Sequence, residues 1–148
     1  SESPSGTIVG QVAARETVMG SESPRAILMS PIWAELWNGA VQRGLDVYFN
    51  RYRNVIARNP EAYDEIAGWA YRDAAGSVIS EMQLSLGEAF GDWVSEVTDE
   101  GAFEFTGVPL GDYRVVVVAD FEGRTLIWAE AVTVRGSIPQ LIEVQNIF

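Results

Sequence analysis

The stretch Thr98–Tyr113 reads TDEGAFEFTGVPLGDY, and its turns and alternation decide the fold. The carboxylate of Asp99 can accept hydrogen bonds from backbone amides in a turn, and Gly101 can adopt a positive φ angle. A tight turn is therefore expected here. Phe103 and Phe105 then share one face of an alternating segment, which is typical of a half-buried strand. The aromatic rings are therefore expected to fill a core beside the turn.

A second turn and further strands surround this segment. Val108–Gly111 (VPLG) predicts a tight turn, because proline fixes φ and glycine tolerates unusual backbone angles. The run Val115–Val118 is typical of a strand buried on both faces. Seven short strands separated by polar turns predict an antiparallel Greek-key sandwich. The strand patterns lie at Thr7–Ala14, Ala26–Met29, Trp93–Thr98, Ala102–Phe105, Asp112–Asp120, Leu126–Val134 and Ile138–Ile147.

The intervening residues 31–90 follow a helical period instead. Ser30 and Pro31 form a helix start, with a hydroxyl cap and a proline at the first helical position. Apolar residues recur every three or four positions, and Pro60 is expected to end this first helix near Arg58. A second helix follows, and the short link makes the two antiparallel neighbours. The apolar faces comprise Trp33, Trp37, Val41, Leu45, Tyr48, Tyr52 and Val55 in the first helix, and Tyr63, Ile66, Ala67, Ala70, Ala74, Val78, Met82 and Leu86 in the second.

These segments together predict one α+β domain, which is the size expected for 148 residues. Its fold class is a seven-stranded antiparallel Greek-key β-sandwich with an inserted antiparallel helical hairpin. The single domain covers residues 1–148, in which 7–30 and 92–148 form the sandwich and 31–90 form the helical hairpin.

The stretch at 98–113 closely resembles the signature of carboxypeptidase-regulatory-like domains, T-D-x-G-x-F-x-F-x-G-V-P-x-G-x-Y, which are transthyretin-like sandwiches. Gly6–Val12 (GTIVGQV) is similar to the first strand of that family. The resemblance implies a bacterial exported, surface or accessory module that mediates contacts, and it carries no catalytic residue. Relatives that act chemically use histidines or a Lys–Asn cross-link, and this chain has neither His nor Lys. The expected location is therefore extracytoplasmic: secreted, periplasmic or on the cell surface.

Residue inventory and charge exclude most function classes. The chain has no His and no Cys, and all ten cations are Arg, which removes His-dependent triads, the usual zinc sites and lysine nucleophiles. A net charge of −11 disfavours nucleic acid and anionic membranes. No run reaches the roughly 18 apolar residues of a membrane-inserted helix. We expect no enzyme activity, no cofactor and no metal. The acidic residues Asp92, Glu96, Asp99, Glu100 and Glu104 are read as a solvated edge rather than a calcium site.

The predicted function is a non-catalytic exported binding or assembly module. The alternatives are a carbohydrate-binding module, which needs a planar row of exposed aromatic rings, and a glycan hydrolase that uses two carboxylates. The first residues, beginning at Ser1, are predicted to form a flexible leader. This leader is either the start of a mature exported protein or the result of an arbitrary boundary of the sequence.

The helical hairpin is the predicted contact surface, because its apolar residues exceed one stripe per helix. The expected partner is a protein or a second copy, with a two-fold homodimer as the default. A competing interpretation is that the rings pack within the hairpin and on the sandwich. The predicted partner-binding residues are Trp33, Trp37, Phe49, Trp69 and Tyr71. Arg51, Arg53 and Arg58 are expected to pair with Glu61, Asp64 and Glu65.

Overall fold

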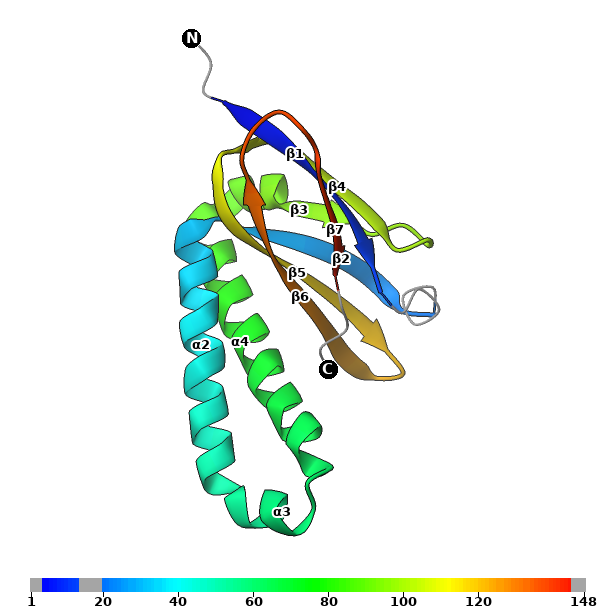
Figure 1. Ribbon diagram of the computed structural model, residues 1–148. Coiled ribbons are helices and arrows are strands. Elements are labelled where there is room, and N and C mark those ends of the chain that lie inside the picture. The colour runs from blue at the N-terminus through cyan, green and yellow to red at the C-terminus, as the bar shows by residue number, and fades with distance from the viewer. Residues whose placement is uncertain (1–3, 14–19, 145–148) are drawn as a thin grey trace.

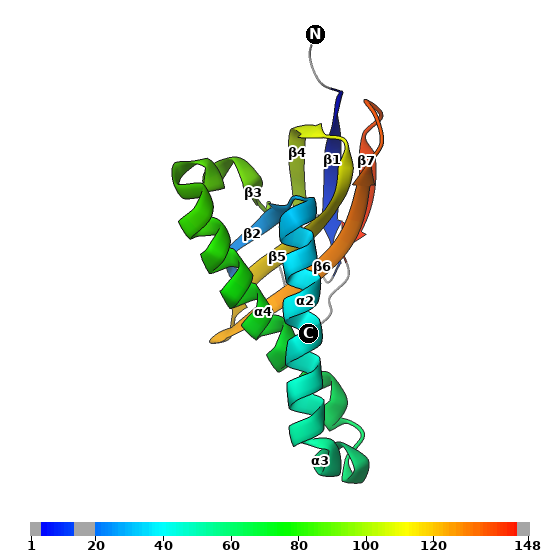
Figure 2. The same ribbon diagram turned by 90° about the vertical axis from the view of Figure 1, so that its left-hand side faces the viewer.

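The computed structural model describes residues 4–13 and 20–144, which form three layers (Figures 1 and 2). A three-stranded sheet of order β4-β1-β7 packs on a four-stranded sheet of order β3-β2-β5-β6. Two long antiparallel helices, α2 and α4, cover the other face of the four-stranded sheet. The predicted α+β class is confirmed, with the helices between β2 and β3 in the chain.

Each predicted strand overlaps an observed one, although the boundaries differ. The predicted first helix is interrupted at Tyr52, which has φ −108° and ψ 18°. Ala14 and residues 145–147, assigned to the first and last strands, lie outside the described residues. The strands are β1 (Ser5–Val12), β2 (Glu22–Met29), β3 (Val94–Glu96), β4 (Ala102–Pro109), β5 (Gly111–Phe121), β6 (Arg124–Val134) and β7 (Gln140–Val144). The helices are α2 (Pro31–Arg51), α3 (Arg53–Arg58), α4 (Ala62–Leu86) and the 3-10 helix η1 (Gly87–Trp93).

One strand pair contradicts the prediction of an entirely antiparallel arrangement. β1 runs antiparallel to β4 but parallel to β7, with Val9 opposite Leu141. The reason is that β6 belongs to the four-stranded sheet and β7 to the three-stranded one, so the chain changes sheets between them. No hairpin joins β7 to its neighbour, and nothing forces the pair to be antiparallel.

The core between the two sheets contains the aromatic residues of the 98–113 stretch. Phe103 and Phe105 are 4% and 6% exposed, as their alternation predicted. Gly101 has φ +82°, which confirms the turn before β4. The buried Tyr113 donates a hydrogen bond from its hydroxyl to the carbonyl of Pro109 at 2.7 Å. The stretch thus joins β4 to β5 and fills the space between the sheets.

The second core lies between the four-stranded sheet and the helices. Val115 and Val117 face the inter-sheet core, whereas Val116 and Val118 face the helices, so the strand is buried on both sides as predicted. The helical contribution comes from the half of the pair that overlies the sheet. It includes Trp37 and Val41 of α2 and Ala74, Ala75, Val78, Ile79 and Met82 of α4.

Candidate functional site

The helical pair extends beyond the sheet and forms an arm, defined here as residues 46–69 (Figures 1 and 2). The end of α2, the short α3 and the start of α4 compose it. Phe49 stacks on Tyr63 with ring centroids 4.6 Å apart. Trp69 receives the rings of Tyr48 and Tyr52 edge-on at 5.8 and 5.5 Å. The arm is therefore held together by its own aromatic side chains, away from both cores.

The five predicted partner-binding residues divide between the arm and the body. Trp37 is only 2% exposed, so the expectation that it contacts a partner is wrong, because its ring fills the helix–sheet core. Trp33 and Tyr71 pack against the same core, and Tyr71 lies 6.1 Å from Trp37. Phe49 and Trp69 are half-buried within the arm. The structure therefore gathers Trp33, Trp37 and Tyr71 at the helix–sheet core, while Phe49 and Trp69 pack on other rings of the arm.

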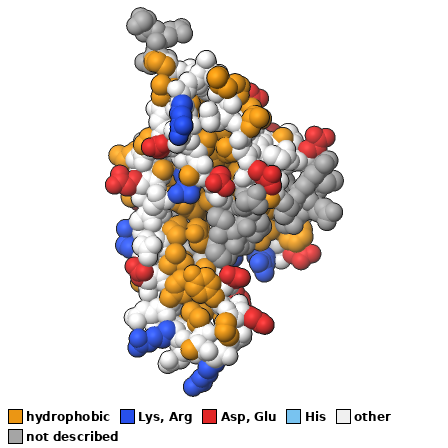
Figure 3. Space-filling model, viewed as in Figure 1, with side chains coloured by type: hydrophobic (Ala, Val, Ile, Leu, Met, Phe, Trp, Pro, Cys, Tyr) orange, Lys and Arg blue, Asp and Glu red, His pale blue; other side chains and the backbone are white. Residues whose placement is uncertain are grey.

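Three exposed apolar residues of the arm were not in the predicted set. Val47, Val55 and Tyr63 are 53%, 48% and 50% exposed. Val55 and Tyr63 had been placed on the buried helix faces, which is wrong. Interruption of the helix at Tyr52 changes the direction of the chain before Val55, and Tyr63 lies in the first turn of α4, beyond the sheet. Hydrophobic side chains are visible along the arm in Figure 3.

The charged residues of the arm form no ion pairs among the described residues. Arg51, Arg53 and Arg58 are exposed and make no ion pair, which contradicts the expected pairing with Glu61, Asp64 and Glu65. The arginines occupy the end of α2 and α3, whereas the acids lie at the start of α4. The arm therefore carries a basic and an acidic portion, and neither forms ion pairs within residues 4–13 and 20–144.

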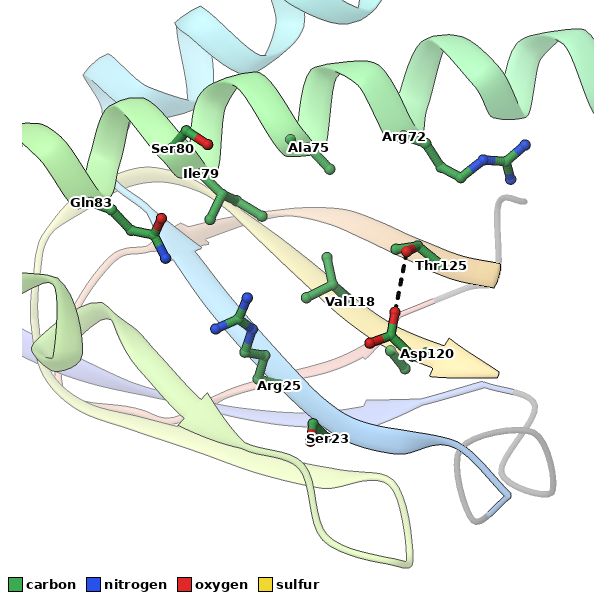
Figure 4. Close-up of a pocket in the computed structure, with 12 residues that line it drawn as sticks. Ser23, Arg25, Arg72, Ala75, Ile79, Ser80, Gln83, Val118, Asp120 and Thr125 are labelled. Atoms are coloured by element: carbon green, nitrogen blue, oxygen red, sulfur yellow. Dashed lines mark hydrogen bonds between the residues drawn. The ribbon is translucent and has the colours of Figure 1, made fainter. Parts of the chain in front are cut away.

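A groove of about 450 Å³ lies between α4 and the four-stranded sheet (Figure 4). Arg25 of β2 and Arg72 of α4 line it from two sides. Asp120 accepts a hydrogen bond from the hydroxyl of Thr125 at 3.2 Å. Apolar side chains of both layers complete the lining, with Ala75, Ile79 and Val118 between the polar groups. Long-range packing creates the groove, so no local sequence pattern indicates it.

A second pocket, of about 470 Å³, lies where η1 and β3 meet β4. Two exposed carboxylates, Asp92 and Glu104, line it beside Trp93. Two carboxylates beside an aromatic ring are what the hydrolase alternative requires. Within residues 4–13 and 20–144, no group of three or more acidic, His or Cys side chains is placed to hold a metal ion.

Comparison with known proteins gives no assignment. No family model matches the sequence, and no curated protein matches it. A crystal structure from Pseudomonas aeruginosa, of a protein described as a candidate carbohydrate-binding protein, is 13% identical with a TM-score of 0.40, over 99% of this chain and 91% of that one. A structure of the pilus backbone protein RrgB of Streptococcus pneumoniae is 10% identical with a TM-score of 0.35, and the match covers 96% of this chain and 41% of that one. The full-length RrgB structure is 12% identical with a TM-score of 0.33, and the match covers 98% of this chain and 31% of that one.

Similarity at these TM-scores carries no argument about what this chain does. None of the described helices combines the length and apolar character that crossing a membrane requires.

Proposed function

We propose that this chain is a non-catalytic binding or assembly module of the carboxypeptidase-regulatory-like type that acts outside the cytoplasm. Its signature stretch folds as that resemblance implies, with Gly101 at a positive φ and Phe103 and Phe105 in the inter-sheet core. The chain has no His, Cys or Lys to supply the usual bases and nucleophiles. The contact surface of the module is the helical arm. Surface labelling of intact source cells tests the location.

The exposed apolar side chains of the arm carry this proposal. Val47, Val55 and Tyr63 are each about half exposed although they lie next to a well-packed aromatic cluster. Burial of apolar surface contributes about 25 cal/mol per Å², so covering these side chains favours association. Aromatic residues such as Tyr are enriched at the centres of protein interfaces. The arm thus presents exposed apolar side chains on a projecting element.

The arm's charges point to a second copy of the chain as the partner. Arg51, Arg53 and Arg58 have no acidic partner within the described chain, and the acids at the start of α4 have no basic one. In the proposed dimer the basic portion of one arm lies against the acidic portion of the other, and two-fold symmetry forms this contact twice. Charges without an ion-pair partner in one copy then become paired between copies.

Sedimentation equilibrium at micromolar concentration tests the proposal. We expect the wild-type protein to dimerise and the variant Val47→Ser, Val55→Ser, Tyr63→Ser to be monomeric. A matched control, Ile32→Ser with Leu84→Ser, replaces residues that are 67% and 82% exposed but lie outside the arm, and it is expected to dimerise. A monomeric wild-type protein contradicts self-association, and a monomeric control contradicts the role of the arm.

A glycan hydrolase at the pocket of Asp92, Glu104 and Trp93 is the second candidate function. The observation in its favour is the presence of two carboxylates and an aromatic ring in one pocket. Against it, both acids are exposed, whereas a general acid is usually set apart by water-excluding surroundings. Release of reducing sugar from a panel of polysaccharides, abolished by Glu104→Gln, would establish this activity.

The carbohydrate-binding alternative lacks the required platform in the described residues. Tyr63 is the one exposed aromatic side chain within residues 4–13 and 20–144, and it stacks on Phe49. A single ring does not form a planar row, so this alternative gains no support from the aromatic residues.

A further inference from the structure

The groove between α4 and the four-stranded sheet shares no residue with the arm. We propose that it binds a small organic carboxylate, whose charged group is recognised by Arg25. The groove is of ligand size, because pockets for small molecules usually span about 300–1,000 Å³ and this one measures about 450 Å³.

The guanidinium of Arg25 has no protein partner within the described residues. Arg25 lies opposite Glu96 in the register of β2 and β3, yet no ion pair joins the two side chains. It extends instead from β2 into the groove, towards the wall formed by α4 (Figure 4). Arg72 is likewise unpaired. The groove therefore holds two guanidinium groups without an ion-pair partner among the described residues.

The backbone that presents Arg25 is irregular. The register of β2 against β5 shifts between Glu22 and Arg25. Ser23, within this shift, has φ +47°, a left-handed conformation that is uncommon for a residue other than glycine. Bulges of this kind re-aim side chains and are enriched next to binding sites. Ser23 itself lines the groove, so the irregularity and the cavity coincide.

The remaining lining suits a ligand with an apolar part. Ile79 of α4 and Val118 of β5 face each other across the groove (Figure 4). The side chains of Gln83 and Ser80 on α4 supply neutral hydrogen-bonding groups, and neither side chain makes a hydrogen bond within the described residues. A carboxylate on a small hydrocarbon frame therefore matches the arginine at one place and the aliphatic side chains beside it.

A carboxylate fits this groove better than a phosphate. Phosphate sites commonly use free backbone amides at a helix N-terminus or in a glycine-rich loop. Here α4 contributes residues from its middle, between Arg72 and Gln83, where the amides bond within the helix. Apart from Ser23, which lies in the register shift, the strand residues of the lining are paired in the sheet. The planar guanidinium of Arg25 matches a carboxylate with two parallel hydrogen bonds.

The test is an NMR titration of the ¹⁵N-labelled full chain with cyclohexanecarboxylate. Its neutral isostere, cyclohexanecarboxamide, and inorganic phosphate are the comparison probes. We expect cyclohexanecarboxylate to shift the amides of groove residues saturably, and the two comparison probes to bind at least about tenfold more weakly. Arg25→Gln should weaken binding of the carboxylate by about tenfold or more, because it removes the charged donor.

The exposed Arg135, which does not line the groove, provides the control, and Arg135→Gln should leave binding unchanged. Unchanged amide spectra outside the groove show that each variant is folded. Equal binding of carboxylate and carboxamide, equal binding of phosphate, unaltered binding by Arg25→Gln, or no saturable shift overturns the proposal. These results leave the dimer proposal untouched, since the arm is intact in every sample.

Discussion

Gly44 of α2 faces Ala70 of α4 so closely that a Cβ built on Gly44 would lie 3.0 Å from the Cβ of Ala70. A side chain at position 44 would therefore require Ala70 to move by at least a few tenths of an ångström. Gly44→Leu is expected to lower the free energy of unfolding by about 1–3 kcal/mol, because the added atoms force the helices apart. Chemical denaturation followed by circular dichroism measures this loss.

Gly76 provides the matched control for that substitution. It lies in the middle of α4, is exposed, and has no atom within 4 Å of a built Cβ. Gly76→Ala should therefore stabilise the protein by up to about 1 kcal/mol through helix propensity alone. If Gly44→Leu were as stable as the wild type, the close helix contact would be wrong.

Gly10 of β1 makes the corresponding contact in the inter-sheet core. It lies opposite Phe103 in the β1–β4 register, and a Cβ at position 10 would lie 2.0 Å from the phenyl ring. The ring is buried and has little room to move, so Gly10→Ala should destabilise the protein by about 1–3 kcal/mol. Gly136→Ala, where nothing lies within 4 Å of a built Cβ, should be tolerated in the same denaturation experiment.

Tyr113 links stability to alkaline pH. Burial raises the pKa of its hydroxyl above the ordinary value of 10.0. The folded state therefore holds this proton more tightly than the unfolded state. The stability that this difference adds is fully present below pH 10 and is lost as pH rises through the raised pKa. Tyr113→Phe should cost about 0.5–1.5 kcal/mol at neutral pH by removing the bond to Pro109. Its unfolding free energy should also fall less steeply above pH 10 than that of the wild type.

The pKa of Tyr48 is also raised, but for a different reason from that of Tyr113. Its hydroxyl donates a hydrogen bond to the carboxylate of Asp73, which is the main cause that raises the pKa of Tyr48, followed by burial. Asp73→Asn should lower the pKa of Tyr48 towards 10.0 while leaving that of Tyr113 raised. An NMR titration of the tyrosine rings resolves the two, and an unchanged pKa for Tyr48 would show that Asp73 has no such effect.

Local patterns in the sequence predicted the local structure. The turn before β4 follows from Gly101, the start of α2 from Pro31, and the double-sided burial of β5 from four consecutive valines. The break between α2 and α3 falls at Tyr52, where neither Gly nor Pro stands, so the sequence gives no sign of it. The parallel pairing of β1 and β7 depends on a change of sheet, which periodicity does not encode.

The candidate site was less predictable, because exposure depends on where the sheet ends. Trp37 and Tyr63 both follow the helical apolar period, yet Trp37 is buried over the sheet and Tyr63 is half exposed beyond it. The period identifies a face of a helix but not what covers that face. The groove likewise joins Arg25 and Arg72, whose proximity depends on the packing of α4 on β2 and β5.

If two copies meet through their arms with charges paired across a two-fold axis, exchanging those charges should prevent each variant from pairing with itself and allow the two variants to pair with each other. One variant carries Arg51→Glu, Arg53→Glu and Arg58→Glu, and the other carries Glu61→Arg, Asp64→Arg and Glu65→Arg. Each variant alone places like charges opposite each other, whereas an equimolar mixture places opposite charges together. At a salt concentration of about 0.01 M, where the Debye length is about 30 Å, sedimentation equilibrium should show each variant as a monomer and the mixture as a heterodimer. Variants that dimerise alone as the wild type does, or a mixture that stays monomeric, would show that the arms do not pair in this way.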